Sequence, residues 1–165
     1  MPDKGNIAAV VTVSDSASSG HREDTSGDSL QSLLENAGFD VRYREVVPDE
    51  KQLIRSVLER LCSMRDVHLI ITTGGTGIGP RDVTPEATLE VVERQLPGMA
   101  EAMRMESLKK TPFAMTSRQI VGVFQTTLII NMPGSPKAVE ECFNVVRPVL
   151  HHVVDLIHGH TQHKA

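Results

Sequence analysis

Short runs of apolar, β-branched residues alternate with amphipathic segments along most of this 165-residue chain. The apolar runs have the length of strands, and between them apolar residues recur at the spacing of a helix. This alternation favours an α/β domain with a largely parallel sheet and helices on both faces. Strands are expected at residues 7–13, 40–47, 67–72, 120–124 and 128–132, with a hairpin between the last two.

Helices are expected between these strands. Leucines recur at helical spacing from about Ser29, and Gly38 would end that helix. The apolar residues of 53–61 form a second helical face. The segment before it, Asp49-Glu50-Lys51-Gln52, has the pattern of a capping box with Asp49 as the N-cap residue.

Proline marks the starts of the later helices. Thr84-Pro85 has the pattern of an N-cap followed by proline at the first helical position, and Ser135-Pro136 repeats this pattern. Pro97-Gly98 is expected to break the helix that starts after Thr84, with a further helix at residues 99–108. A final helix is expected after Pro148.

The composition excludes several classes of function. The net charge is -4, so the chain has no broad basic surface for nucleic acid. With four Phe, one Tyr and no Trp, it also lacks an aromatic platform for single-stranded nucleic acid. No apolar run reaches the roughly 18 residues of a membrane span, and the N-terminus lacks the pattern of a signal peptide. The cytoplasm is therefore the expected location.

One domain is expected over residues 1–165, with its core at about 7–157 and a mobile tail at 158–165. Cys62 and Cys142 have no metal-binding spacing, so buried free thiols are expected, as in a reducing compartment. Histidines are frequent late in the chain without a carboxylate at metal-site spacing, which favours a surface helix and a frayed end. These are His151, His152, His158, His160 and His163.

The strongest local signal is the glycine turn, Thr73-Gly74-Gly75-Thr76-Gly77, which directly follows an apolar strand. Open α/β sheets bind ligands at the carboxyl ends of their strands, and glycines there let backbone N–H groups approach an anion. The segment is neither a P-loop, because no Gly-Lys-Ser/Thr follows, nor a dinucleotide fingerprint, because Pro80 takes the third glycine's place. The alternative is a tight turn whose glycines only provide a positive φ.

Acidic residues lie close to this turn in the sequence or at a neighbouring strand end. Asp82 could hold Mg²⁺ against bound phosphates, since Mg²⁺ prefers oxygen ligands. The alternative is a solvated loop acid. Asp49 follows another strand, so it is either a helix cap or part of the same site. Arg81 and Lys137 are candidate cations for the phosphates.

Polar residues follow two further strands. Ser14-Asp15-Ser16 and Asp24-Thr25-Ser26-Gly27 flank the first loop, where they are either ligand contacts or turn and cap residues. Pro133-Gly134-Ser135-Pro136 is a helix N-terminus after a strand, which is either an anion site or an ordinary helix start. His21 is a further candidate for contact with phosphate.

Taken together, these segments resemble the molybdopterin adenylyltransferase family, which comprises bacterial MogA/MoaB-type proteins and the G domains of proteins such as gephyrin. The resemblance runs from about Ile7 to Ile157. The matching segments, in chain order, are Val13-Ser14-Asp15-Ser16, Asp24-Thr25-Ser26-Gly27, Val47-Pro48-Asp49-Glu50, Thr72-Thr73-Gly74-Gly75-Thr76-Gly77, Pro80-Arg81-Asp82-Val83-Thr84-Pro85-Glu86-Ala87-Thr88, Pro97-Gly98-Met99, Thr116-Ser117-Arg118 and Leu128-Ile129-Ile130-Asn131-Met132-Pro133-Gly134-Ser135-Pro136.

The resemblance implies a three-layer αβα sandwich with a mostly parallel sheet, mixed at one edge, and a homotrimer. It implies the transfer of AMP from Mg-ATP to the terminal phosphate of molybdopterin, with release of pyrophosphate. The family's two aspartates tied to this step match Asp49 and Asp82, which would hold Mg²⁺ through the phosphates. The glycine turn with Thr76 would bind the pterin or its phosphate, and Ser107 and Ser117 match substrate-binding positions. The molybdate-insertion enzyme is a candidate partner.

The expected binding residues are therefore Ser14, Asp15, Gly74, Gly75, Thr76, Gly77, Arg81, Ser107, Ser117, Pro133, Gly134 and Ser135. Two alternatives stay open: a MoaB-type protein that binds molybdopterin or a precursor without chemistry, and a scaffold module. Some family members have Arg where Ser16 stands, which leaves the contacts of the first loop open. The retained Arg-Asp-Val-Thr-Pro-Glu segment favours an active enzyme.

Overall fold

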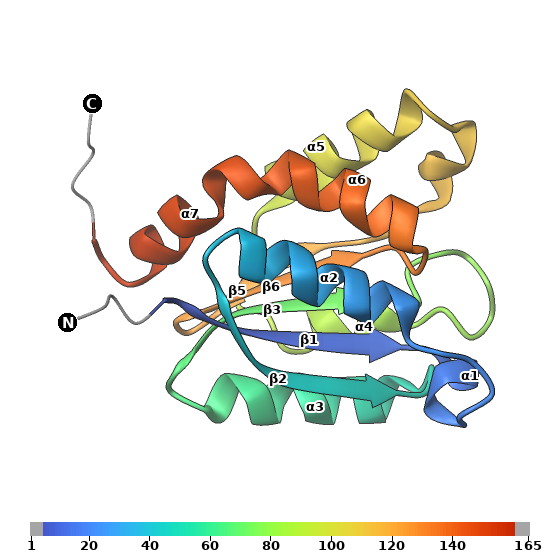
Figure 1. Cartoon of the computed structure of the whole chain (residues 1–165), viewed down its shortest axis with the longest axis horizontal. Helices are drawn as coiled ribbons and strands as arrows, with labels where there is room; N and C mark the ends of the chain where they lie inside the picture. Colours follow the sequence, from blue (N-terminus) through green and yellow to red (C-terminus); the bar gives the residue numbers. More distant parts are fainter. Residues whose placement is uncertain (1–4, 161–165) are drawn as a thin grey trace.

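The computed structural model describes residues 5–160 and contains a six-stranded sheet with the order β2-β1-β3-β6-β5-β4 (Figure 1). The strands β2, β1, β3 and β6 run parallel to one another, whereas β5 at one edge pairs antiparallel with both β6 and β4. A mostly parallel sheet mixed at one edge is thereby confirmed. The strands are β1 Ile7–Val13, β2 Asp40–Val47, β3 Val67–Thr73, β4 Arg94–Gln95, β5 Val121–Phe124 and β6 Thr127–Met132.

Helices cover both faces of the sheet and complete the three-layer αβα sandwich (Figure 1). Four of them, α2, α5, α6 and α7, pack on one face, and α3 and α4 pack on the other. The helices are α1 Asp15–Ser18, α2 Thr25–Asn36, α3 Lys51–Ser63, α4 Thr84–Leu89, α5 Pro97–Leu108, α6 Pro136–Val146 and α7 Leu150–Ile157, with 3-10 turns η1 Pro112–Thr116 and η2 Arg147–Val149.

The central strands β1, β3 and β6 are mainly apolar because helices cover both of their faces. In β1, Ala8 and Val10 lie in the core beneath α2 and α6, whereas Ala9 and Val11 lie in the core beneath α3. Successive side chains of a strand point to opposite faces, so a strand buried on both sides reads as a continuous apolar run. This explains why the strands predicted from apolar runs agree closely with the observed strands.

Two element boundaries differ from the sequence prediction. Helix α2 begins at Thr25 rather than near Ser29, because Asp24 caps it by accepting a hydrogen bond from Gly27 N at 3.0 Å. The first turn is polar, so apolar periodicity did not reveal it. Pro97 and Gly98 begin α5 instead of breaking a longer helix, since α4 already ends at Leu89.

Both predicted caps at Asp49 and Thr84 were wrong. Helix α3 is preceded by Glu50 as its N-cap residue and has no side-chain cap hydrogen bond. Thr84 lies within the first turn of α4, and its hydroxyl donates to the carbonyl of Gly74 at 3.0 Å. Both side chains are therefore available to the glycine turn rather than to a helix terminus. The cap at Ser135 is confirmed, since its hydroxyl accepts from Ala138 N.

Both cysteines are buried free thiols, as predicted. Burial raises the pKa of the Cys62 thiol to about 12, so this group stays protonated and inert at neutral pH. No helix within residues 5–160 is long and apolar enough to cross a membrane.

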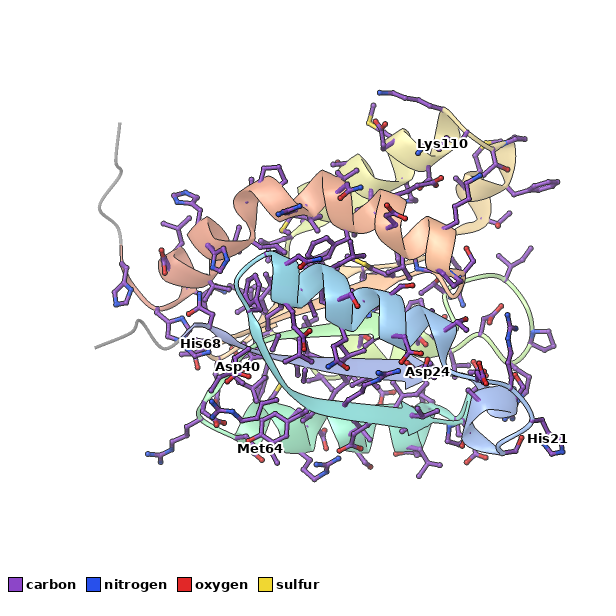
Figure 2. All side chains as sticks on the ribbon, in the orientation of Figure 1. His21, Asp24, Asp40, Met64, His68 and Lys110 are labelled. Carbon is purple, nitrogen blue, oxygen red and sulfur yellow. The ribbon has the colours of Figure 1, made fainter. Side chains whose placement is uncertain are left out.

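The late histidines lie on α7 and just after it, as expected, although His151 also has a structural role. Its ring stacks on Phe39 at a centroid distance of 4.3 Å. His68 lies at the end of the sheet opposite His21, as Figure 2 shows, and its ring is 5.1 Å from that of His158. No group of histidine, cysteine or carboxylate side chains among the described residues could hold a metal by itself. Residues 161–165 of the predicted tail, with His163, lie outside the described part.

Candidate active site at the carboxyl ends of the strands

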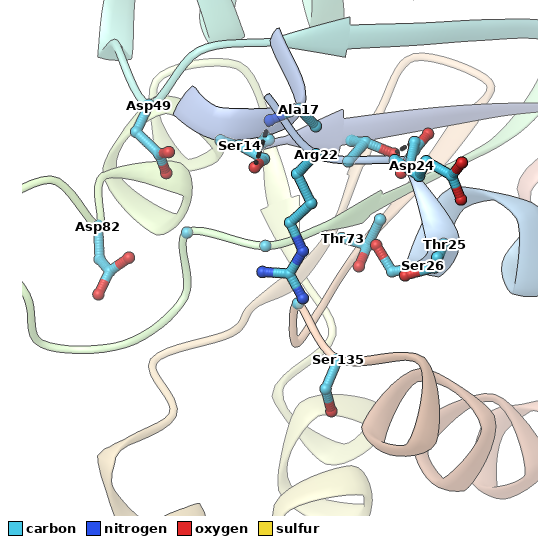
Figure 3. A pocket seen from close by; sticks show the side chains of 16 residues that line it. Ser14, Ala17, Arg22, Asp24, Thr25, Ser26, Asp49, Thr73, Asp82 and Ser135 are labelled. Atoms are coloured by element: carbon cyan, nitrogen blue, oxygen red, sulfur yellow. Dashed lines mark hydrogen bonds between the residues drawn. The ribbon is translucent and has the colours of Figure 1, made fainter. Parts of the chain in front are cut away.

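The loops that follow β1, β2, β3 and β6 meet at the carboxyl end of the sheet, where they enclose a pocket of about 330 Å³ (Figure 3). We call it the first pocket. Parallel strands place all their carboxyl ends on one edge, which is where open α/β sheets bind ligands. Its lining residues are Thr12, Val13, Ser14, Ala17, Arg22, Glu23, Asp24, Thr25, Ser26, Asp49, Thr73, Gly74, Gly75, Asp82, Gly134 and Ser135.

The glycine turn forms one wall of this pocket, and its first two glycines are required by the backbone. Gly74 and Gly75 have φ angles of +99° and +69°. A Cβ on Gly74 would lie 2.2 Å from the carbonyl oxygen of Val13, and one on Gly134 would lie 3.4 Å from the Cα of Gly74. The glycines thus allow the ends of β1, β3 and β6 to approach one another closely. Gly74 and Gly75 have a positive φ and also line the first pocket. The turn can therefore be a tight turn that needs glycine and a ligand-binding turn at the same time.

Asp49 is held by the loop after β1 rather than by α3. The backbone N–H of Asp15 donates to Asp49 Oδ2 at 2.9 Å, and the N–H of Asp49 donates back to Asp15 Oδ1 at 3.0 Å. Burial raises the pKa of the Asp49 carboxyl above its ordinary value, and the negative charges of Asp15 and Asp82 add to this rise. A cation that entered the first pocket would relieve this repulsion.

Arg81 is already occupied by an acidic partner. Its guanidinium donates from Nε and from a terminal nitrogen to the two oxygens of Asp15, at 3.1 and 2.9 Å. These bonds lower the pKa of the Asp15 carboxyl. Neither residue lines the first pocket, and their contact with a ligand stays a prediction.

Asp82 closes the loop that connects the glycine turn to α4. The N–H of Gly79 donates to Asp82 Oδ2 at 2.9 Å, and the N–H of Asp82 donates to the carbonyl of Gly79 at 3.0 Å. A Cβ on Gly77 would approach the same carboxylate oxygen to 2.9 Å. Asp82 therefore shapes its own loop and also presents its carboxylate to the first pocket.

Arg118 supports this loop from the opposite side. Its guanidinium donates to the carbonyls of Gly77 at 2.8 Å and Asp82 at 2.7 Å, and it pairs with the carboxylate of Glu86. The N–H of Arg118 also donates to the carbonyl of Thr76 at 2.8 Å. The sequence does not reveal this role of Arg118, because its partners lie more than thirty residues away in the chain.

A second pocket of about 260 Å³ lies on the other side of the glycine turn. Two of the turn's residues, Thr76 and Gly77, line it, and the exposed ring of Phe113 also contributes. Its remaining lining residues are Arg104, Ser107, Thr111, Ala114, Thr116, Ser117, Gln119, Pro133, Ala138 and Glu141. The glycine turn is therefore a wall between two pockets.

Most of the predicted site residues line one or the other of these two pockets. Those in the first pocket are Ser14, Asp49, Gly74, Gly75, Asp82, Gly134 and Ser135. Those in the second pocket are Thr76, Gly77, Ser107, Ser117 and Pro133. Lys137 and His21 line neither pocket. His21 is exposed, and its ring is hydrogen bonded to the Ser19 hydroxyl at 2.7 Å. Sequence reasoning missed Arg22, whose position in a polar loop carries no recognisable pattern.

The family described as "Probable molybdopterin binding domain" matches residues 9–152, which is most of the chain. This chain belongs to the molybdopterin-binding domain family. Among its relatives, a protein named molybdopterin adenylyltransferase from Helicobacter pylori strain 26695 is 45% identical over 152 residues, covering 91% of this chain and 86% of the relative. A protein of the same name from Escherichia coli K12 is 40% identical, covering 91% and 77%.

Solved structures of the molybdopterin-binding domain family have the same fold. The molybdopterin biosynthesis enzyme MoaB from Thermus thermophilus has a TM-score of 0.87 at 44% identity, with 93% of this chain and 96% of that chain covered. The molybdopterin biosynthesis Mog protein from Mycobacterium ulcerans has a TM-score of 0.88 at 39% identity, with 92% and 99% covered.

In this molybdopterin-binding domain, we expect Asp49→Asn to raise the melting temperature at pH 7. Folding raises the pKa of Asp49, so its ionised form destabilises the folded state above that pKa, and this penalty disappears as the pH falls below about 4. Asparagine removes the charge but keeps an oxygen that can accept from Asp15 N–H. Thermal unfolding is measured in Mg²⁺-free buffer between pH 4 and pH 8. The difference in melting temperature between Asp49→Asn and the unmodified protein should shrink towards low pH. A difference that grows towards low pH would contradict the raised pKa.

Proposed function

We propose that this chain is a molybdopterin adenylyltransferase that acts in molybdenum cofactor biosynthesis. The observation that carries the proposal is the pair of pockets on the two sides of the glycine turn, with Asp49 and Asp82 both in the first. Two adjoining pockets suit a reaction between two bound substrates. The activity named for relatives at 40–45% identity supports the proposal.

The chemistry requires positioning more than it requires a strong base. An oxygen of the terminal phosphate of molybdopterin attacks the α-phosphorus of ATP, the bond from that phosphorus to the bridging oxygen of the β-phosphate breaks, and pyrophosphate leaves with the electron pair. The attacking oxygen is already anionic at neutral pH. The protein must therefore hold two polyanions together and stabilise the charge on the leaving pyrophosphate.

We assign the ATP phosphates to the first pocket and the pterin to the second. The first pocket contains the two aspartates and the backbone of Gly74 and Gly75. The second is lined mostly by apolar and hydroxyl-bearing residues, including Phe113 and Ser117, together with Arg104, Gln119 and Glu141. This assignment refines the expectation that the whole glycine turn binds the pterin side. Its first half would face the nucleotide phosphates, and its second half, with Thr76, would face the pterin.

The side chains of the first pocket are suited to Mg²⁺ only together with a phosphate ligand. The carboxylates of Asp49 and Asp82 repel each other, and this repulsion contributes to the raised pKa of Asp49. No cluster of described side chains forms a complete metal site, and Mg²⁺ commonly binds through one or two carboxylates plus substrate phosphates. When bound, Mg²⁺ would neutralise charge on the phosphates.

We also propose the cytoplasm as the location, a homotrimer as the assembly and the molybdate-insertion enzyme as a partner that receives the product. Exposed apolar side chains next to the second pocket, Phe113 and Met115, support burial of this surface in an assembly. Light scattering that gives three times the mass of one chain is the expected result, and a monomer at micromolar concentration would contradict the trimer.

The alternative is a molybdopterin-binding protein without adenylyltransferase activity. It would use the second pocket but would have no need for the aspartates of the first. We expect pyrophosphate to be released only when ATP, Mg²⁺ and molybdopterin are all present. Tight molybdopterin binding with no pyrophosphate release would favour the binding protein.

A further inference from the structure

Arg22 is the one cationic side chain among the described residues that line the first pocket. The pocket is otherwise rich in carboxylates, which are those of Glu23, Asp24, Asp49 and Asp82. A phosphate ligand that enters such a pocket meets strong repulsion unless a cation compensates for it. The charge balance of the first pocket therefore depends on Arg22 and on any cation that the ligand brings.

Unlike the other arginines around the site, Arg22 has a free guanidinium. Within residues 5–160 it makes no hydrogen bond or ion pair, and it is exposed. By contrast, Arg81 binds Asp15 and Arg44 binds Asp24 and Asp28. An arginine that already has a partner must lose it before it can bind a ligand, whereas Arg22 has none to lose.

The position of Arg22 suits a ligand in the first pocket. Figure 3 shows its side chain reaching from the loop before α2 into the pocket, with the guanidinium between Asp82 on one side and Thr73 and Ser26 on the other. The hydroxyl of Thr73 donates to the carbonyl of Pro133 at 2.7 Å, so this wall is fixed. The guanidinium thus faces the space that Asp82 and the glycine turn enclose.

We propose that Arg22 binds a phosphate group of the substrate in the first pocket. This inference rests on the proposed adenylyltransferase function. A guanidinium presents a planar set of donors that matches two oxygens of one phosphate, and such charge-assisted bonds are stronger than those between neutral groups. The phosphate comes either from ATP or from molybdopterin, and the kinetic constants of the two substrates distinguish these sources.

The test compares Arg22→Gln, Arg22→Lys and a control, Arg147→Gln. Arg147 is exposed in η2, lines neither pocket, and its replacement changes the net charge by the same amount. Each variant is assayed for the KM of ATP and of molybdopterin, and for the binding of Mg-ATP alone by calorimetry. Melting temperatures show whether the variants fold normally.

We expect Arg22→Gln to raise the KM for ATP and to weaken the binding of Mg-ATP by about tenfold or more, since bonds to charged groups contribute on this scale. The KM of Arg22→Lys for ATP should lie between the values for the unmodified parent protein and for Arg22→Gln, because lysine keeps the charge without the planar pair of donors. Arg147→Gln should have the same KM values and the same affinity for Mg-ATP as the parent protein.

The kinetic constants of Arg22→Gln decide whether Arg22 binds phosphate and which substrate carries that phosphate. A rise in the KM for molybdopterin alone supports phosphate binding by Arg22 and identifies molybdopterin as the source. Parent-like constants for both substrates in a folded Arg22→Gln variant overturn the inference. If the parent makes no adenylylated product but Arg22→Gln still weakens Mg-ATP binding, the proposed function fails and the inference about Arg22 stands.

Discussion

Replacing Asp82 with asparagine should lower kcat for adenylylation on the order of 10²-fold, while the KM for molybdopterin changes little. Asp82 lines the pocket assigned to the ATP phosphates, and its charge is expected to act there through Mg²⁺. Asparagine can still accept from the N–H of Gly79, so the loop should keep its shape. Steady-state measurements of pyrophosphate release at varied molybdopterin concentration separate the two constants.

The matched control is Asp155→Asn, since Asp155 is an exposed residue of α7 that lines neither pocket. Its kinetic constants should equal those of the parent. If Asp82→Asn showed near-normal turnover with a raised KM for molybdopterin, then Asp82 would belong to the pterin side and the assignment of the first pocket would be wrong.

The largest expected effect on stability is that of Gly74→Ala. The residue has a φ of +99°, and a Cβ there would lie 2.2 Å from the carbonyl oxygen of Val13 in the neighbouring strand. The backbone of Val13 cannot move aside as a flexible side chain can. The strain of the positive φ at position 74 and the steric overlap with the Val13 carbonyl therefore add together. We expect a loss of about 3 kcal/mol or more in the free energy of unfolding, measured by urea denaturation.

Gly98→Ala is the control for this substitution. Gly98 lies in the first turn of α5, its φ is not in the left-handed region, and an added Cβ would meet no atom within 4 Å. Its stability should stay within about 1 kcal/mol of the parent or rise slightly. Equal stabilities for the two alanine variants would mean that the turn can relax, and that Gly74 is not required by the backbone.

Patterns within a short segment predicted the layers of this fold well. Strand β1 is buried on both faces, so its side chains are almost all apolar and its ends stand out against polar loops. In β3, Leu69, Ile70 and Ile71 form a similar buried apolar run. The prediction missed β4, because two exposed residues, Arg94 and Gln95, carry no periodicity. Such an edge strand exists only because β5 provides a partner for it.

Tertiary contacts set the hydrogen-bond partners of the candidate site residues, and local patterns do not reveal these partners. Asp49 matched a capping box, yet its carboxylate binds the backbone of Asp15, which lies 34 residues away in the sequence. Arg81 looked available for phosphate, yet its partner is the same Asp15, 66 residues away. A partner at such a distance cannot be read from spacing, and for the same reason no local pattern indicated that Arg22 lacks one. The resemblance to the family, rather than the capping pattern, brought Asp49 into the predicted site.

The transfer of AMP is tested most directly by following labelled phosphorus from ATP. The parent protein is incubated with Mg²⁺, molybdopterin and ATP labelled at either the α- or the γ-phosphate, and the pterin product is isolated and weighed by mass spectrometry. We predict that the α-label enters the pterin product, whose mass rises by one adenylyl group, and that the γ-label leaves as pyrophosphate. An unmodified pterin, or a pterin product that carries the γ-label, would contradict it.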